Sequence, residues 1–360
     1  MYVITNRVVF EDREGLDAFG DDPNPSGPNE LRLVKVSESG KFNTEVQKDR
    51  LKPAEVKELI KKHGLDIDPA GKWFASLRVA CELYQRALDE KKHLLLFVHG
   101  YNNDLSDIIR TSRQLQQLYN VIVVPFSWPA NGGGKLSGTA AYLSDKDDAR
   151  SSATAFHRAV DKVDFYYTSL TKSLQRTLWD RALARHRDNP GKAYAVFDEL
   201  LRKECDLSLN LMCLSMGNYV LKYATKPGNS ALRKLVFDNV SLVAADANNP
   251  EHAEWVQSIP TRNRLFVVIN ENDGALKWSR RKPGDEQKER LGAHLRNLTA
   301  SNAYYISVTR NRGVGDEHSY FKGSTVSQNA TLKGMFKKMF EGGDAESGLD
   351  YRADLNFYHS

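Results

Sequence analysis

Residues 206–221, DLSLNLMCLSMGNYVL, constrain the possible fold more than any other stretch of the chain. In the first half, leucine and cysteine alternate with other residues, and the run is apolar enough to lie inside a sheet. The chain then turns sharply at residues 213–217, after which apolar and aromatic residues recur at helical spacing. The stretch therefore predicts a buried strand that leads through a tight turn directly into a helix.

Ser215 lies at the centre of this turn, between Cys213 and Gly217. A serine with small residues two positions away on either side, between a strand and a helix, is typical of a nucleophile elbow. The small neighbours let the strand and helix approach each other, and the exposed hydroxyl lies at a helix N-terminus that favours developing negative charge. Cys213 stands where glycine is commoner. A plain strand–turn–helix junction has the same pattern, so the rest of the chain must decide between the two interpretations.

Length and composition limit the class of protein. With 360 residues, the chain is long enough for one large α/β domain or two ordinary ones. Hydrophobic residues make up 41% and charged residues 27%, which indicates a soluble globular protein. The net charge of +5 is small for this length and basic residues are mixed with acidic ones, so we expect no nucleic-acid partner.

The cysteines and the apolar runs bear on the cellular compartment. Cys81, Cys205 and Cys213 are too few, and odd in number, for a disulfide framework. The first ten residues lack the basic and apolar regions of a secretory signal, and no apolar run is long enough to span a membrane. We therefore expect a cytoplasmic protein without a transmembrane segment.

Strands and helices alternate through the middle of the chain. Apolar patterns predict strands at residues 2–10, 31–36, 93–98, 121–126, 207–213, 240–245, 264–270 and 304–308, and helices at 53–63, 73–90, after 103, over most of 145–201, and at 330–340. Buried strands that alternate with helices indicate a mostly parallel sheet of about eight strands with helices on both faces. We expect one α/β domain over residues 1–340, followed by a polar tail at 341–360 whose end is disordered.

The segment from 130 to 204 is longer than the single helix that the sheet needs between two of its strands. It is therefore predicted to be a helical insertion that caps the site, entered through the glycine loop at 132–134. Its aromatic and apolar side chains suit an acyl pocket: Phe165, Tyr166, Tyr167, Leu170 and Trp179. The alternative is a purely structural helix pair far from the site.

A nucleophilic serine needs a histidine base that is oriented by a carboxylate. Asp273 follows the strand RLFVVIN and His318 follows the last strand, so serine, aspartate and histidine come in the order of an α/β-hydrolase triad. Both lie at strand ends, where the loops of a parallel sheet converge. Two simpler roles stay open: Asp273 as a helix N-cap and His318 as a solvated loop residue. Asp246, at the end of the preceding strand, is the competing acid.

The oxyanion of an acyl-transfer intermediate needs two N–H donors. We expect them from the backbone of Met216, directly after the serine, and of Tyr101, in the loop after the strand HLLLFV. The substrate-binding candidates beside this loop and at neighbouring strand ends are His99, Asn102, Trp128 and Asp246. Of these, His99 has the alternative role of a structural residue that hydrogen-bonds within the loop.

The chain resembles the α/β-hydrolases and, more narrowly, a bacterial family of uncharacterised serine hydrolases. The matching motifs are Thr5-Asn6-Arg7, the F-V-H-G-Y-N run at 97–102, Ser127-Trp128-Pro129, the tyrosine-leucine-x-aspartate run at 142–145 and the S-M-G-N run at 215–218. Leu214 stands where this family usually has histidine. The resemblance covers about residues 2–320 and implies a serine hydrolase fold without a defined substrate.

Other motifs carry less weight. The loop at 130–135 is glycine-rich, but it lacks the first glycine of a phosphate loop, and Leu136 stands where a magnesium-binding hydroxyl is needed. No spacing of ligands suggests a metal site, and no cofactor is expected. The amphipathic helix at 330–340 suits packing on the sheet, with a membrane or partner surface as the alternative.

Taken together, these features predict hydrolysis of an ester or related acyl bond, with a small-molecule or lipid ester as substrate. The alternatives are an amidase or peptidase with the same triad, and a catalytically silent binding protein of the same fold. The sequence leaves the oligomeric state open.

Overall fold

The computed structural model describes the chain except for residues 39–40, 48–49, 131–138, 226–233 and 283–287. The strands are β1 Tyr2–Thr5, β2 Arg7–Val9, β3 Phe19–Pro23, β4 Arg32–Glu38, β5 Phe42–Val46, β6 His93–Val98, β7 Val121–Ser127, β8 Leu209–Leu214, β9 Asn239–Val243, β10 Arg264–Ile269, β11 Ala303–Ser307, β12 Asp350–Arg352 and β13 Phe357–His359. The α-helices are α1 Pro53–His63, α2 Ala75–Glu90, α3 Leu105–Leu118, α4 Thr139–Ser151, α5 Ala153–Arg185, α6 Pro190–Glu204, α7 Gly217–Ala224, α8 His252–Val256, α9 Gly274–Arg280, α10 Gly323–Ser327 and α11 Ala330–Phe340.

The main sheet has eleven strands in the order β12-β13-β11-β10-β9-β8-β6-β7-β1-β4-β5. The strands from β13 to β1 in this order run parallel to their neighbours, whereas β4 and β12 pair antiparallel with β1 and β13. The predicted mostly parallel sheet is therefore confirmed. The sheet has three strands more than the predicted eight, because β5, β12 and β13 are short strands at or next to the sheet edges, in polar segments. The tail at 341–360, expected to end in disorder, instead carries two of these strands.

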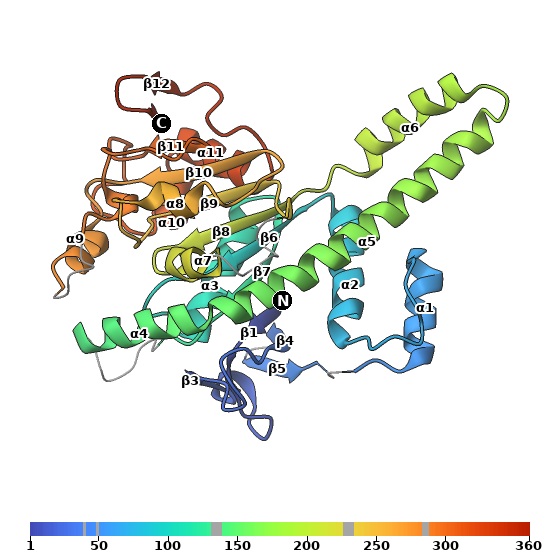
Figure 1. Cartoon of the computed structure of the whole chain (residues 1–360), viewed down its shortest axis with the longest axis horizontal. Coiled ribbons are helices and arrows are strands. Elements are labelled where there is room, and N and C mark those ends of the chain that lie inside the picture. Colours follow the sequence, from blue (N-terminus) through green and yellow to red (C-terminus); the bar gives the residue numbers. More distant parts are fainter. Residues whose placement is uncertain (39–40, 48–49, 131–138, 226–233, 283–287) are drawn as a thin grey trace. The chain divides into compact units, whose positions relative to one another are not determined.

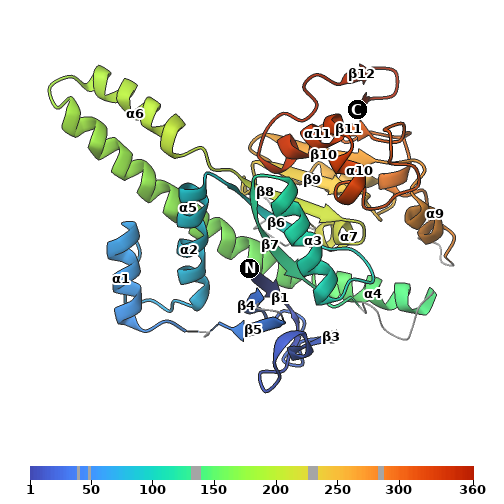
Figure 2. The ribbon, with the colours of Figure 1, turned by 180° about the vertical axis from the view of Figure 1, so that it is seen from behind.

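Helices cover both faces of the sheet, as predicted. One face packs against α3, α10 and α11, and its core contains Phe97, Met212, Phe266 and Phe336. Figure 2 shows these three helices in front of the strands, and α7 lies on the opposite face in Figure 1. The amphipathic side of α11 is buried in this core, so the packing interpretation of this helix is confirmed.

The chain forms two compact units, one of residues 1–45, 93–160 and 208–360 and the other of residues 46–92 and 161–207. The first unit holds the main sheet. The second consists of α1, α2, most of α5 and all of α6, and its core includes Leu77, Tyr84, Tyr166 and Leu170.

The described part of the predicted insertion is helical throughout α4, α5 and α6, apart from short connections. The aromatic side chains between residues 165 and 179 pack within the second unit. Phe165 stacks on Trp73 with ring centroids 5.8 Å apart, and Trp179 contacts Tyr194 and Phe197. This packing explains why the segment carries more aromatic residues than a solvated connector needs.

Candidate active site

Ser215 occupies a strained turn between β8 and α7. Its φ of 51° lies in the left-handed region, which is unfavourable for residues other than glycine. Two backbone hydrogen bonds hold the turn: Ser215 N donates to the Val243 carbonyl at 3.0 Å, and Asp246 N donates to the Ser215 carbonyl at 3.1 Å. The predicted elbow conformation of this segment is therefore present, and the hydroxyl stands at the end of the β8 strand.

Two glycines make room for the turn. A Cβ atom at Gly217 would lie 2.6 Å from the Val98 carbonyl oxygen and 2.7 Å from that of His99. A Cβ atom at Gly100 would lie 2.8 Å from the Cβ of Ser215. All three distances are shorter than real Cβ contacts, so the loop after β6 lies directly against the serine. Cys213 is fully buried, which fits a small side chain at the opposite end of the motif.

Asn218 locks the turn from within α7. Its side-chain amide donates to the carbonyl oxygens of Cys213 and Ser215 at 3.0 Å each. The side chain is fully buried, so water does not compete for these bonds. In the sequence, Asn218 is the last residue of the S-M-G-N motif, which did not disclose this structural role.

Asp273 and His318 form a hydrogen-bonded pair. The distance between Asp273 Oδ2 and His318 Nδ1 is 2.7 Å; the carboxylate is fully buried, and the histidine side chain is 25% exposed. An ionised carboxylate only accepts hydrogen bonds, so Nδ1 donates in this pair, and in the neutral tautomer that fits this bond Nε2 keeps its lone pair. The other carboxylate oxygen, Oδ1, accepts from Leu276 N at 3.0 Å and caps α9. Asp273 is thus an N-cap and a histidine partner at the same time.

Asn270, at the end of β10, joins the two loops that carry this pair. Its amide nitrogen donates to the carbonyls of Gly315 and Glu317, at 3.1 Å each, and its Oδ1 accepts from Asn272 N. Its own carbonyl accepts from Asp273 N. One buried side chain therefore sets the spacing between the aspartate turn and the histidine loop. No motif in the sequence marked it.

Tyr320 connects the histidine loop to the strand ends beside the serine. Its hydroxyl accepts from Ala244 N at 3.0 Å and donates to the Val268 carbonyl at 3.1 Å. Ala244 directly follows Val243, which accepts the hydrogen bond from Ser215 N. Only Ser319 lies between His318 and Tyr320, so these contacts bring the histidine loop to the same edge of the sheet as Ser215. Burial raises the pKa of the Tyr320 hydroxyl, which keeps it neutral.

Asp246, the competing acid, is engaged elsewhere. Its Oδ1 lies 3.0 Å from Arg290 Nε, and both side chains are almost fully buried. Its Oδ2 accepts from the Tyr142 hydroxyl at 3.0 Å, and Oδ1 also accepts from the Ser279 hydroxyl. A carboxylate held by a buried guanidinium and two hydroxyls has no geometry for orienting His318. This arrangement also argues against Asp246 as a direct substrate ligand.

His99 and Trp128 form a closed structural pair beneath the oxyanion loop. The rings stack 5.0 Å apart, Trp128 N donates to His99 Nε2, and the Trp128 indole donates to the His99 carbonyl. His99 Nδ1 donates to the Gly100 carbonyl at 2.9 Å. Burial lowers the pKa of His99 to about 3, so the ring is neutral. Both side chains are fully buried, which favours the structural role that the sequence offered as the alternative for His99.

The buried side chain of Arg7 holds the loops after β6 and β7 together by hydrogen bonds. Its buried guanidinium donates to Ser127 Oγ at 2.9 Å, to the Asn103 carbonyl at 2.9 Å and to the Ala130 carbonyl at 3.1 Å. Burial lowers its pKa to about 10, so it keeps its charge at neutral pH. The Thr5-Asn6-Arg7 motif therefore supports the loops after β6 and β7, a role that the motif alone did not disclose.

The positions expected for the oxyanion donors flank the serine. Met216 is the N-cap residue of α7, and its amide donates no hydrogen bond within the described ranges of the chain. Tyr101 follows Gly100, which touches Ser215. Asn102, the remaining substrate-binding candidate, has a φ of 54°, is exposed, and its backbone N–H donates to Asp145 Oδ2 at 3.4 Å.

Ser215 Oγ and His318 make no direct hydrogen bond among the residues that the structure describes. Catalytic hydrogen bonds of free enzymes are often long and shorten when substrate binds.

Three aromatic rings form a cluster beside the oxyanion loop. Tyr101 lies 5.6 Å from Tyr142 and 6.2 Å from Trp278, and Trp278 is 43% exposed. Trp278 belongs to α9, the helix that Asp273 caps. Partly exposed aromatic surface at this place offers an apolar contact for a substrate. Trp278 was not among the predicted site residues, since a lone tryptophan after the acid carries no recognisable pattern.

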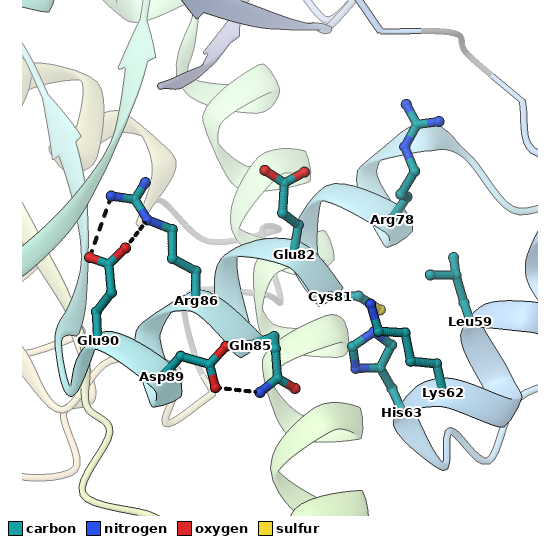
Figure 3. Close-up of a pocket in the computed structure, with 10 residues that line it drawn as sticks. All are labelled: Leu59, Lys62, His63, Arg78, Cys81, Glu82, Gln85, Arg86, Asp89 and Glu90. Atoms are coloured by element: carbon teal, nitrogen blue, oxygen red, sulfur yellow. Dashed lines mark hydrogen bonds and ion pairs between the residues drawn. The ribbon is translucent and has the colours of Figure 1, made fainter.

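Figure 3 shows a pocket of about 430 Å³ in the second unit, lined by residues of α1 and α2. Within it, Arg86 forms an ion pair with Glu90, and the Gln85 amide donates to Asp89. Cys81 lies in its wall, where burial raises the pKa of the thiol to about 11 and keeps it unreactive. We assign no function to this pocket.

Two further expectations concern metals and membranes. Over the described ranges, no group of three or more His, Cys, Asp or Glu side chains is placed to hold a metal ion. No helix in the same ranges is long and apolar enough to cross a bilayer. The glycine-rich loop considered as a phosphate loop, and as the entrance to the cap, lies at 131–138, outside the described residues.

Residues 80–167 match a protein-family model that is described as an alpha/beta hydrolase of unknown function (DUF900). No curated protein matches the chain, and no solved structure matches it. The matched segment holds β6, α3, β7, α4 and the loop that touches Ser215, whereas Ser215, Asp273 and His318 lie outside it. This match and the mostly parallel sheet between two helical layers together identify an α/β-hydrolase fold.

Proposed function

We propose that this α/β-hydrolase-fold protein is a serine hydrolase that cleaves an ester or related acyl bond through an acyl-enzyme. The observation that carries the proposal is the buried Asp273 carboxylate at 2.7 Å from His318 Nδ1, at the sheet edge that also carries the strained Ser215. An aspartate with only a structural role would need no bond beyond the N-cap that it forms on α9, and an ordinary loop histidine would need no buried carboxylate beside it. The combination matches an orienting acid, a base and a nucleophile.

In the proposed mechanism, Ser215 Oγ attacks the carbonyl carbon while His318 Nε2 takes the hydroxyl proton. Asp273 holds the imidazole in the tautomer with Nδ1 protonated and stabilises the imidazolium that forms. The N–H groups of Met216 and Tyr101 stabilise the negative charge on the carbonyl oxygen. His318 then gives the proton to the leaving alcohol. In the second half of the reaction, His318 takes a proton from water, which attacks the acyl-enzyme, and returns the proton to Ser215 Oγ as the acid product leaves.

For the substrate, we propose a small-molecule or lipid ester whose acyl part contacts the cluster of Tyr101, Tyr142 and Trp278. The exposed ring of Trp278 supports this assignment. The insertion as a cap stays a prediction. It rests on Phe165, which is 44% exposed, whereas Tyr166 and Tyr167 pack in the core of the second unit. The free cysteines Cys81, Cys205 and Cys213 favour a cytoplasmic location.

The test is turnover of p-nitrophenyl esters of increasing acyl length by the wild type and by Ser215→Ala. We expect activity that Ser215→Ala abolishes, and a changed length preference in Trp278→Ala with an unchanged melting temperature. A similar change in Phe165→Ala would support the cap. If the wild type hydrolyses no ester but cleaves p-nitroanilides, the protein is an amidase, and if it cleaves neither, the silent binding protein is favoured.

A further inference from the structure

A second cavity lies beside α7, the helix that follows the proposed nucleophile. It has a volume of about 180 Å³, and its wall contains Tyr219 and Lys222 of α7, Lys146 of α4, and Asn248 from the loop after β9. Tyr219 follows Ser215 by four residues, and Asn248 follows Asp246, whose N–H donates to the Ser215 carbonyl. The cavity and the elbow therefore share two of their elements.

Positive charge prevails in this cavity. Lys146, Lys222 and Lys288 line it, against a single carboxylate from Glu251. Lys146 is only 6% exposed to solvent, and its ammonium group lies 4.9 Å from the centre of the Tyr219 ring. An ammonium group has three N–H donors, so a lysine that already bonds within the protein keeps donors for a ligand.

The polar groups around the lysines are also mainly hydrogen-bond donors. Arg150 donates to the Tyr219 hydroxyl at 3.2 Å and lies over the ring of Tyr223, which also lines the cavity. The Oδ1 atom of Asn248 accepts from Arg290 at 2.6 Å, which leaves its amide nitrogen as the donor of that side chain. Charged and neutral donors around a small space suit an oxyanion, because charge-assisted hydrogen bonds are about twice as strong as neutral ones.

The cavity is large enough for a small anionic group. A carboxylate or a phosphate group fits in a volume of about 180 Å³.

We propose that this cavity binds the anionic group of the substrate, so that the enzyme prefers acyl esters that carry a carboxylate or phosphate on the acyl part. This inference rests on the proposed function, because it names the substrate class of the same site. The aromatic cluster then contacts the acyl chain, and the lysines hold its charged end.

The test compares two esters with the same four-carbon acyl length, p-nitrophenyl butyrate and p-nitrophenyl hydrogen succinate, which differ in one terminal carboxylate. We expect the ratio of their kcat/KM values to favour the succinate by about tenfold or more in the wild type. Lys222→Gln and Lys288→Gln should each reduce this preference roughly tenfold. Lys288 is exposed, so its variant also serves if Lys222→Gln destabilises the protein.

The matched control is Lys333→Gln, an exposed lysine on α11 whose loss should leave the ratio unchanged. Raising the ionic strength from about 0.01 to 1 M shortens the Debye length roughly from 30 to 3 Å and should narrow the preference. A wild-type ratio near one, or a ratio that neither cavity variant changes, overturns the proposal.

Calorimetry with inorganic phosphate tests the cavity without any turnover. We expect binding to the wild type that weakens about tenfold in Lys222→Gln and not in Lys333→Gln; absent or equal binding contradicts the anion site. If neither ester is hydrolysed, the proposed function fails, whereas the phosphate titration still decides whether the cavity binds anions.

Discussion

Replacing Asp273 by asparagine separates the two roles that this side chain has in the structure. Asparagine keeps an oxygen for the cap on α9, because Asn and Asp are about equally good N-caps. Toward His318 it presents either an amide N–H or a neutral carbonyl where the wild type has a carboxylate at 2.7 Å. An amide donor forces the imidazole into the tautomer with Nε2 protonated, which cannot take the proton from Ser215.

The expected loss in kcat is therefore large. The same substitution in a well-studied serine protease triad lowers kcat by about 10⁴. Each tenfold change corresponds to about 1.36 kcal/mol, so the loss amounts to roughly 5.4 kcal/mol of transition-state stabilisation. The melting temperature should change little, because the helix cap is kept and the rest of the site is untouched.

Asp246→Asn is the matched control, and it should behave in the opposite way. Asp246 pairs with Arg290 at 3.0 Å, and both are buried, so the variant leaves a guanidinium without its carboxylate. Breaking a buried ion pair costs about 3–5 kcal/mol. At roughly 2–4 °C per kcal/mol, the melting temperature should fall by about 10 °C, while kcat per folded molecule falls far less than in Asp273→Asn.

The assay is kcat on a p-nitrophenyl ester together with thermal unfolding of both variants. If Asp246→Asn loses about 10⁴ in kcat with an unchanged melting temperature and Asp273→Asn stays active, the acid is Asp246, and the assignment from the structure is wrong.

Three other predictions follow from single contacts. Gly217→Ala places a Cβ atom 2.6 Å from a backbone carbonyl oxygen and should lower the free energy of unfolding by about 1–3 kcal/mol. Gly334→Ala, on an open helix surface, should raise this free energy by about 0.5–1 kcal/mol. Chemical denaturation measures both. Asn270→Ala removes the amide that holds the histidine loop and should lower kcat by roughly 10²-fold, and an unchanged kcat would refute its positioning role. Burial raises the pKa of Asp148 from 3.8 to about 6, so the folded state binds the carboxyl proton more tightly than the unfolded chain does. Asp148 therefore destabilises the folded state as the pH rises through this range. Asp148→Asn should raise the melting temperature at pH 7 but not at pH 3.5.

Local patterns were enough to predict much of the fold. The helices α1 and α11 have the predicted bounds, because a proline begins one and a glycine in the left-handed conformation ends it, and a clear apolar stripe marks the other. The buried strands β6 to β11 were predicted within a few residues, since their apolar runs exceed what a loop tolerates. The short edge strands β5, β12 and β13 escaped prediction, because three to five mixed residues carry no period.

The site was predictable only where its residues stand at strand ends. Ser215, Asp273 and His318 could be found from their order along the chain. The choice between Asp273 and Asp246 depends on Arg290, which pairs with Asp246 from a distant loop. Asn270 likewise acts through loops that meet only in the folded chain.

The most direct measurement of the central claim is covalent labelling by a fluorophosphonate, followed by mass spectrometry of the labelled peptide. A fluorophosphonate reacts with a serine that an adjacent histidine base activates far faster than with an ordinary serine. We predict one adduct per chain, on Ser215, that is absent in Ser215→Ala and forms far more slowly in His318→Ala. Labelling of another residue, equal labelling of Ser215→Ala, or an unlabelled wild type would contradict Ser215 as the nucleophile.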